Sequence, residues 1–309
     1  MPRWNESRLR TAYERLIVRS LPGVPTGKIR VNTEGWQNVV FEVGDQFIFR
    51  FPRTARNARE LAIETRLLER LAPVLPLSVP DPIVVGRIPE TKGWPFMGYR
   101  RIPGQPEDWD RVSPVLRHKI AEDLAPLLQK LARFPTSLAL RLGVRGGGPS
   151  KWKSLHEQEL RRVRRLAFPV MREPLRRSVL DAFRAYLDDP KNFMWRPCLV
   201  HTEIHGGHVL MRQRRVSGVI DWGYAAVGDP ARELAAWASH FGTQDLSTLA
   251  RGRMTSRDET FLARVALYRT LVPVYHIVGG VQSGNEQMVR SGLRYLRRAL
   301  RTPLDRGWT

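Results

Sequence analysis

The sequence predicts an α+β fold of two lobes, with a small β-rich N-terminal lobe containing one helix and a larger, mainly helical C-terminal lobe. Three observations predict this. Residues 27–53 alternate in polarity and are rich in β-branched and aromatic side chains, as strands are. Residues 55–72 have the apolar period of a helix. Beyond Ser113 helical periodicity dominates, so we place the boundary between residues 1–104 and 105–309.

The N-terminal lobe is predicted element by element from spacing and turn residues. Apolar residues at helical spacing predict a helix over residues 6–20. Residues 27–53 predict three strands, with turns at 32–38 and 43–46. Residues 75–106 contain repeated prolines and are predicted to be strand and loop.

The C-terminal lobe begins with Ser113, a suitable N-cap residue before Pro114. The glycine-rich residues 141–150 follow no strand, and we predict a flexible connection there, not a phosphate-binding loop. Two helices are predicted in 151–189. Short strands are predicted at 196–201, 208–211 and 215–222, and helices at 230–242, 257–270 and 284–301.

Composition places the chain among ordinary globular proteins, with 42% hydrophobic and 26% charged residues. No apolar run approaches the roughly 20 residues of a membrane helix, and the N-terminus lacks the apolar core of a signal peptide. We therefore expect a cytoplasmic protein, and we expect it to be a monomer. The single cysteine, Cys198, excludes an internal disulfide.

The formal net charge of +21 comes mostly from arginine and favours anionic partners such as phosphates or nucleic acid. The arginines are spread along the whole chain and are not gathered in one tail. We therefore interpret the charge as compositional and expect no nucleic-acid partner. A nucleic-acid-binding protein remains the rival interpretation, and it requires arginines on one face together with aromatic side chains.

Polar residues flank the short strands between residues 199 and 230. His208 follows Glu203 by five positions, and Asp221 follows His208 by thirteen. This order matches a kinase catalytic loop and its metal-binding acid. In phosphoryl transfer one carboxylate orients the acceptor hydroxyl, while a second carboxylate and a neutral ligand hold the metal ion at the phosphates.

Two other interpretations of this stretch remain open. His201, His205 and His208 could form a three-histidine zinc site, which we rank lower because it leaves the acids unexplained. Glu203 could also belong to a protein that binds nucleotide without catalysing a reaction.

The chain resembles the aminoglycoside/macrolide phosphotransferase family, which has a protein-kinase-like two-lobe fold, from about Gly35 to Leu296. The matching motifs are HTEIHGGH at 201–208, IDW at 220–222 and GDPARE at 228–233. The N-terminal half also has motifs similar to those of the family. The family's nucleotide loop is matched by EGWQN and its phosphate-contacting strand by FRFPR. The helix paired with that strand is matched by ELAIETRLLERL and the hinge by GYRRIPG.

The resemblance implies a role for each matching position. Glu203 is implied as the catalytic base, supported by His201 and His205, and Mg²⁺ is implied at His208 and Asp221. The implied residues for ATP or GTP are Gly35, Trp36, Asn38, Arg50, Glu64, Arg100, Arg101 and Ile102.

Three positions depart from the family pattern. Glu203 replaces aspartate, and its extra methylene predicts reduced activity because small misplacements slow reactions strongly. His208 stands where most members have asparagine, as in the macrolide kinases, and Arg50 replaces lysine.

The expected acceptor is a small hydroxylated, antibiotic-like molecule. Acids are few beyond Asp229, and the positive charge repels polycations, so a macrolide-like acceptor is favoured over an aminoglycoside. Val274, Tyr275, Val278 and Val281 are predicted either to offer it an apolar face or to be helix core.

Overall fold

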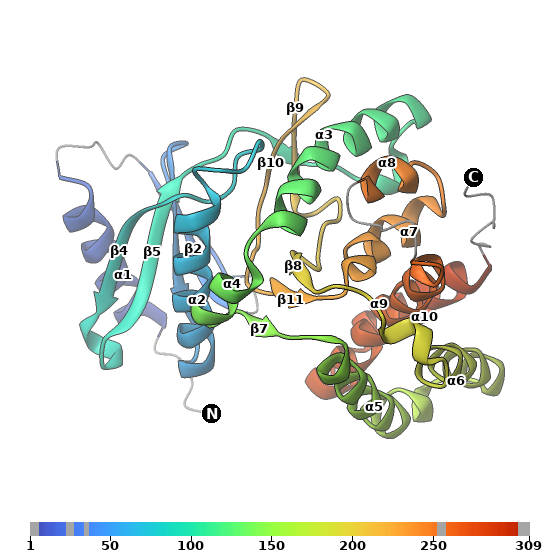
Figure 1. The fold of residues 1–309 in the computed structure, drawn as a ribbon. Helices are drawn as coiled ribbons and strands as arrows, with labels where there is room; N and C mark the ends of the chain where they lie inside the picture. The colour runs from blue at the N-terminus through green and yellow to red at the C-terminus, as the bar shows by residue number, and fades with distance from the viewer. Residues whose placement is uncertain (1–5, 23–27, 34–36, 252–257, 302–309) are drawn as a thin grey trace. The chain divides into compact units, whose positions relative to one another are not determined.

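The computed structural model describes the chain except residues 1–5, 23–27, 34–36, 252–257 and 302–309 (Figure 1). The chain divides into two compact units, of which the first is Met1–Gly104 with Ser217–Gly223, and the second is Gln105–Val216 with Tyr224–Thr309. The first unit is rich in strands and the second in helices, which confirms the predicted α+β class. Residues 217–223 were assigned to the C-terminal lobe from the sequence, but their contacts place them in the first unit.

A five-stranded antiparallel sheet forms the centre of the first unit, in the order β1-β2-β3-β5-β4. The three strands predicted within residues 27–53 are present. The strands are β1 (Ile29–Asn32), β2 (Asn38–Val43), β3 (Phe47–Pro52), β4 (Pro82–Ile88) and β5 (Trp94–Arg100). The helices are α1 (Glu6–Ser20), α2 (Ala55–Leu71) and the short 3-10 helix η1 (Pro89–Thr91).

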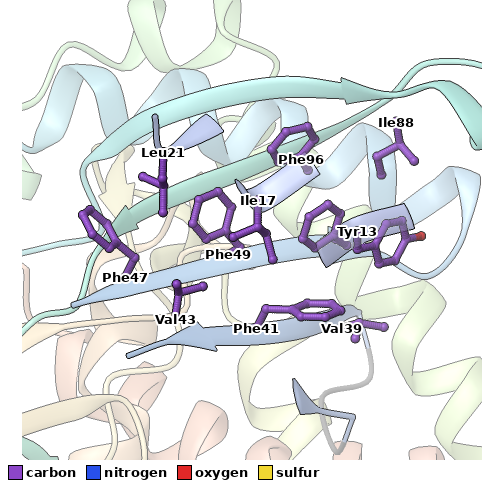
Figure 2. Close-up of a cluster of buried hydrophobic side chains, with 11 residues drawn as sticks. Tyr13, Ile17, Leu21, Val39, Phe41, Val43, Phe47, Phe49, Ile88 and Phe96 are labelled. Carbon is purple, nitrogen blue, oxygen red and sulfur yellow. The ribbon is translucent and has the colours of Figure 1, made fainter. Parts of the chain in front are cut away.

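The hydrophobic core of this unit lies between α1 and one face of the sheet (Figure 2). Side chains alternate between the two faces of a strand, so every second residue of β2 and β3 points to this core. The Tyr13 ring stacks on Phe51 at 4.1 Å between centroids. The cluster consists of Tyr13, Ile17, Leu21, Val39, Phe41, Val43, Phe47, Phe49, Phe51, Ile88 and Phe96. The same alternation turns Arg50 to the opposite face, where it meets α2.

Helices form most of the second unit. They are α3 (Pro114–Arg133), α4 (Thr136–Arg141), α5 (Pro149–Leu166), α6 (Glu173–Leu187), α7 (Ala235–Phe241), α8 (Leu246–Ala250), α9 (Phe261–Ser283) and α10 (Glu286–Arg301). Short 3-10 helices are η2 (Trp109–Arg111), η3 (Phe168–Val170), η4 (Pro190–Phe193) and η5 (Pro230–Leu234). As predicted, the Ser113 side chain caps α3 by accepting a hydrogen bond from the Leu116 amide.

Short strands in the second unit flank residues 201–208. β8 (Cys198–Val200) pairs with β11 (Ala226–Gly228), which also pairs with β7 (Arg145–Gly146), and β6 (Gln105–Pro106) pairs with β9 (Val209–Arg212). β10 (Arg215–Val219) carries the chain from the second unit back to the first.

The prediction of a flexible connection at residues 141–150 was wrong. Arg145 and Gly146 form β7 and pair with Ala226 and Val227. Gly146 has φ of +118°, and a Cβ there would lie 1.9 Å from the Val227 carbonyl oxygen. Glycine is therefore required by close strand packing at this position.

The helix predicted over 257–270 extends further than expected, because α9 continues through Pro273 to Ser283. Proline usually ends a helix, but burial of the residues on both sides holds this one together. α9 is the one described helix that is long and apolar enough to cross a membrane, and 67% of its most apolar window is buried inside the structure, as in a core helix. Val274 and Val278 are fully buried, so they belong to the core and offer no face to an acceptor.

Candidate active site

In the first unit, Arg50 and Glu64 form a buried ion pair that joins β3 to α2. Alternation along β3 turns Arg50 toward α2, and the helical period places Glu64 on the buried face of α2. Thr54 fixes the start of α2, because its side chain accepts a hydrogen bond from the Asn57 amide at 3.1 Å. A cation on a strand is thus held by an acid on the following helix.

Asp221 adds a second carboxylate to this pair. The next residue, Trp222, is buried, and its backbone N–H donates to Glu64 Oε1 at 3.3 Å. Burial raises the pKa of Glu64, the Arg50 guanidinium counteracts this, and the Asp221 carboxylate raises the pKa further. Asp221 also interacts electrostatically with the Arg50 guanidinium, so two acids surround one cation and the balance of charge suits a further cation.

The backbone at Asp221 is itself unusual. Asp221 has φ of +64°, in the left-handed region that few residues other than glycine occupy. Such conformations persist where the surrounding structure enforces them, and they gather at functional sites. The Trp222 indole, which donates to the Val219 carbonyl at 3.0 Å, helps to hold this turn.

In the second unit, residues 201–208 form the loop between β8 and β9. The backbone N–H groups of His201 and Thr202 donate to the two carboxylate oxygens of Glu233, at 2.5 and 3.2 Å. Thr202 has φ of +75°, which is rare for a β-branched residue, and its hydroxyl donates to the Tyr224 carbonyl at 3.1 Å. The buried Glu233 carboxylate therefore fixes a strained backbone directly before Glu203.

Glu233 is the positioning residue that sequence reasoning missed. It appeared there only as an acid within GDPARE, with no role assigned. The sequence signal that could have identified it is its place four residues after Asp229. Asp229 is fully buried and accepts hydrogen bonds from Arg264, Tyr268 and the Ala231 amide. Asp229 therefore anchors the turn that delivers Glu233.

The imidazoles of the loop contact the loop's own backbone. His201 Nδ1 accepts from the Glu203 amide at 3.3 Å, and His205 Nδ1 accepts from the Gly207 amide at 3.1 Å. His208 Nδ1 lies 2.9 Å from the Glu203 carbonyl oxygen, so it must donate. In that tautomer Nε2 carries the lone pair, the atom through which a neutral imidazole binds a metal ion. With each Nδ1 engaged by backbone, the arrangement favours loop support over a three-histidine zinc site.

Of the two glycines near the end of the loop, packing requires glycine at position 206. A Cβ on Gly206 would lie 2.2 Å from the Glu107 carbonyl oxygen and 2.8 Å from the Trp109 ring. The Glu107 amide in turn donates to the Gly206 carbonyl at 3.2 Å. Trp109 belongs to an aromatic cluster with Trp237 and Phe241, so the loop rests on a rigid surface.

The remaining predicted nucleotide residues make other contacts. Arg100 lies over the Phe47 ring, Arg101 pairs with Glu42 at 3.1 Å, and Ile102 is buried. Asn38 begins β2 and is buried. Gly35 and Trp36 lie outside the residues that the structure describes.

Comparisons with known proteins agree with this arrangement. Residues 28–268 match the phosphotransferase enzyme family. Viomycin phosphotransferase of Streptomyces vinaceus is 28% identical over 293 residues, which cover 93% of this chain and 98% of that protein. The solved GDP complex of wild-type aminoglycoside 2'-phosphotransferase-IIIa is 25% identical, with a TM-score of 0.80 and coverage of 94% and 97%. A macrolide 2'-phosphotransferase type I is also 25% identical, with a TM-score of 0.70 and coverage of 94% and 96%.

Proposed function

Because the chain belongs to the phosphotransferase enzyme family, we propose that it transfers the γ-phosphoryl group of ATP or GTP to a hydroxyl group of an antibiotic-like acceptor. The observation that carries this proposal is the buried Arg50–Glu64 pair with Asp221 beside it. Phosphoryl transfer depends on positioning and electrostatics, and these charges occur in kinase order along the chain.

Arg50 is proposed to contact the nucleotide phosphates, with Glu64 holding its guanidinium in place. Arginine binds phosphate through a planar fork of donors, so it serves this role with a geometry different from that of lysine. The GDP complex of an aminoglycoside phosphotransferase relative supports nucleotide binding, and the choice between ATP and GTP is left to experiment.

Asp221 and His208 are the residues we propose for Mg²⁺. A carboxylate oxygen is a ligand that Mg²⁺ favours, and the excess negative charge around Asp221 fits a cation. His208 Nε2 is the ring atom that carries the lone pair, because Nδ1 donates to the Glu203 carbonyl. When bound, the ion would neutralise negative charge on the phosphates.

Glu203 is proposed to orient the acceptor hydroxyl and accept its proton. Glu233 holds the backbone directly before this residue, and His201 holds its own N–H, as expected for a side chain that must be aimed. The longer side chain is proposed to act at reduced efficiency relative to aspartate.

The acceptor is proposed to carry little positive charge, as a macrolide does, because the net charge of +21 opposes the approach of a polycation. Charge is the main support for this preference, since Val274 and Val278 are core residues, while Tyr275 and Val281 are half-buried.

The test is a panel of macrolides, aminoglycosides and viomycin, each incubated with ATP or GTP and Mg²⁺ and assayed by mass spectrometry for added phosphate. We expect a phosphorylated product with at least one acceptor and none with Asp221→Asn. Nucleotide binding without transfer to any acceptor would favour the non-catalytic alternative.

A further inference from the structure

α9 carries two buried arginines whose surroundings differ. Arg264 is fully buried, and its guanidinium donates hydrogen bonds of 2.7 to 3.3 Å to both carboxylate oxygens of Asp229 and of Asp258. Arg269, five residues later, has only 6% of its surface exposed. It forms no hydrogen bond or ion pair with any residue that the structure describes. Two acids therefore neutralise the first guanidinium, and none in the described chain neutralises the second.

The guanidinium of Arg269 has buried donors without acceptors. Its Nε and Nη1 atoms are enclosed and have no hydrogen-bond partner among the described residues. Burial is the one cause that shifts the pKa of Arg269, which it lowers. Burial also acts on Arg264, but the hydrogen bonds and charges of Asp258 and Asp229 raise the pKa of that group above its ordinary value. Arginine keeps its proton in proteins, and an unpaired buried charge is strongly destabilising, so the charge of Arg269 calls for a partner.

The sequence of α9 does not provide this partner. The helix contains no aspartate or glutamate along its whole length. Residues three and four positions away share a face with Arg269, and they are Val265, Ala266, Val272 and Pro273. These side chains are all apolar and cannot accept a hydrogen bond. The partner therefore has to come from outside the helix.

The third guanidinium nitrogen of Arg269 gives access from outside. Nη2 is not among the enclosed atoms, so a small ligand can reach the edge formed by Nη1 and Nη2. A carboxylate or a phosphate binds this edge of a guanidinium through two parallel N–H···O hydrogen bonds. A water molecule can satisfy a donor, but it leaves the positive charge uncompensated. The charge and the donor geometry together favour a small anion with two oxygen atoms side by side.

From these observations we infer that Arg269 is the centre of a binding site for a small oxyanion, which accepts hydrogen bonds from Nη1 and Nη2. The site uses none of the residues assigned to phosphoryl transfer, so it stands or falls separately from the proposed function. The bound anion stabilises α9, which also carries Arg264 and Tyr268, the two side chains of α9 that donate to Asp229.

The test is thermal unfolding of the full chain at neutral pH in sodium phosphate, sodium acetate or sodium chloride, at equal ionic strength. Phosphate and acetate represent the two sources of an oxyanion, a phosphate group and a carboxylate, and chloride is the reference. We expect phosphate or acetate, at about a hundred times its dissociation constant, to raise the melting temperature by about 5 °C over chloride.

Arg269→Met removes the charge and the donors and keeps a long apolar side chain. The gain from the oxyanion should disappear in this variant. In chloride it should melt at least as high as the parent, because a buried charge without a partner has been removed. Arg269→Lys keeps the charge without the fork of donors, and its gain should fall clearly below that of the parent.

The matched control is Arg297→Met, because Arg297 is exposed on α10 and the substitution makes the same change in net charge. This variant should keep the full gain. Equal gains in the parent and in Arg269→Met would overturn the inference, since the anion then binds elsewhere on the basic chain. So would the absence of a gain in the parent with either oxyanion. If Arg269→Met does not fold, Arg269→Lys decides, and a gain equal to that of the parent overturns the inference.

Discussion

Glu203 occupies the position where the resembling family has aspartate, and its surroundings are built to aim it. The backbone before it is fixed by Glu233, its own amide donates to His201 Nδ1, and its carbonyl accepts from His208. A loop with this many constraints on the backbone leaves the side chain as its main variable. The length of the Glu203 side chain is therefore the feature whose effect on catalysis a substitution can test.

We predict that Glu203→Gln lowers kcat by about a hundredfold, because an amide cannot take the proton from the hydroxyl group of the substrate. Glu203→Asp should instead raise kcat, since the shorter carboxylate suits the family's loop. Steady-state kinetics with the best acceptor from the panel measures both. Equal kcat for glutamine and glutamate would show that the carboxylate has no chemical part.

At the scale of elements, η5 and the 201–208 loop act together. Asp229 holds the start of η5, and η5 places Glu233 where it accepts two consecutive backbone N–H groups. A carboxylate can accept both hydrogen bonds. An amide side chain has one oxygen to accept a hydrogen bond, and its NH2 group would face the other backbone N–H. The geometry of the loop thus depends on the charge state and shape of a residue outside it.

We predict that Glu233→Gln lowers kcat about a hundredfold through misplacement of the loop by about 1 Å. Nucleotide affinity should change little, because Arg50 and Glu64 belong to the first unit. Isothermal titration with the nucleotide and steady-state kinetics separate the two effects. A large loss of nucleotide affinity with unchanged kcat would contradict this role.

α5 provides a pH-dependent contact through His156, which is buried beside Trp152 and Tyr186. Burial lowers the pKa of His156 from 6.5 to about 4. The folded state prefers the neutral ring, so its contribution to stability is complete above pH 6.5 and is lost as pH falls toward 4.

The expected loss over that interval is about 3 kcal/mol of unfolding free energy, at about 1.36 kcal/mol per pH unit. Urea denaturation of the parent and of His156→Gln, repeated from neutral to acid pH, isolates this contribution. Parallel pH profiles for the two proteins would rule it out.

The elements with clear periodicity were predictable, and the exceptions have physical reasons. Strands β2 and β3 follow from alternation, because one face of each meets α1. The helix predicted to end at residue 270 continues to Ser283, because burial, which local sequence does not show, sustains it past Pro273. β7 was missed because two residues beside glycines carry no strand pattern, and their pairing with β11 is formed by residues distant in sequence.

Motifs in the sequence name the candidate site residues, whose roles remain predictions, and they do not give the contacts of those residues. The sequence predicts Glu203, His208, Arg50, Glu64 and Asp221 by order along the chain. The hydrogen bonds from residues 201 and 202 to Glu233 span more than 30 positions, and such contacts exist only once the chain has folded.

At the scale of the whole molecule, nucleotide binding should appear as added stability. A ligand that binds only the folded state contributes about 2.7 kcal/mol at a hundred times its dissociation constant. We therefore predict that saturating ATP or GTP with Mg²⁺ raises the unfolding free energy by about this amount, measured by chemical denaturation. Asp221→Asn should show a smaller gain if the metal ion contributes, and no gain with either nucleotide in the parent chain would contradict nucleotide binding.

The return of residues 217–223 to the first unit has a consequence for synthesis on the ribosome. The Val219 amide donates to the Ser78 carbonyl at 2.9 Å, and Trp222 donates to Glu64, so the first unit receives part of its structure from the middle of the chain. Chains emerge from the N-terminus onward, and contacts between distant residues form late. While residues 105–216 are being made, the nascent first unit is incomplete, because Glu64 and the Ser78 carbonyl do not yet have these hydrogen-bond donors. Assembly of the first unit therefore finishes only after much of the second unit has been translated.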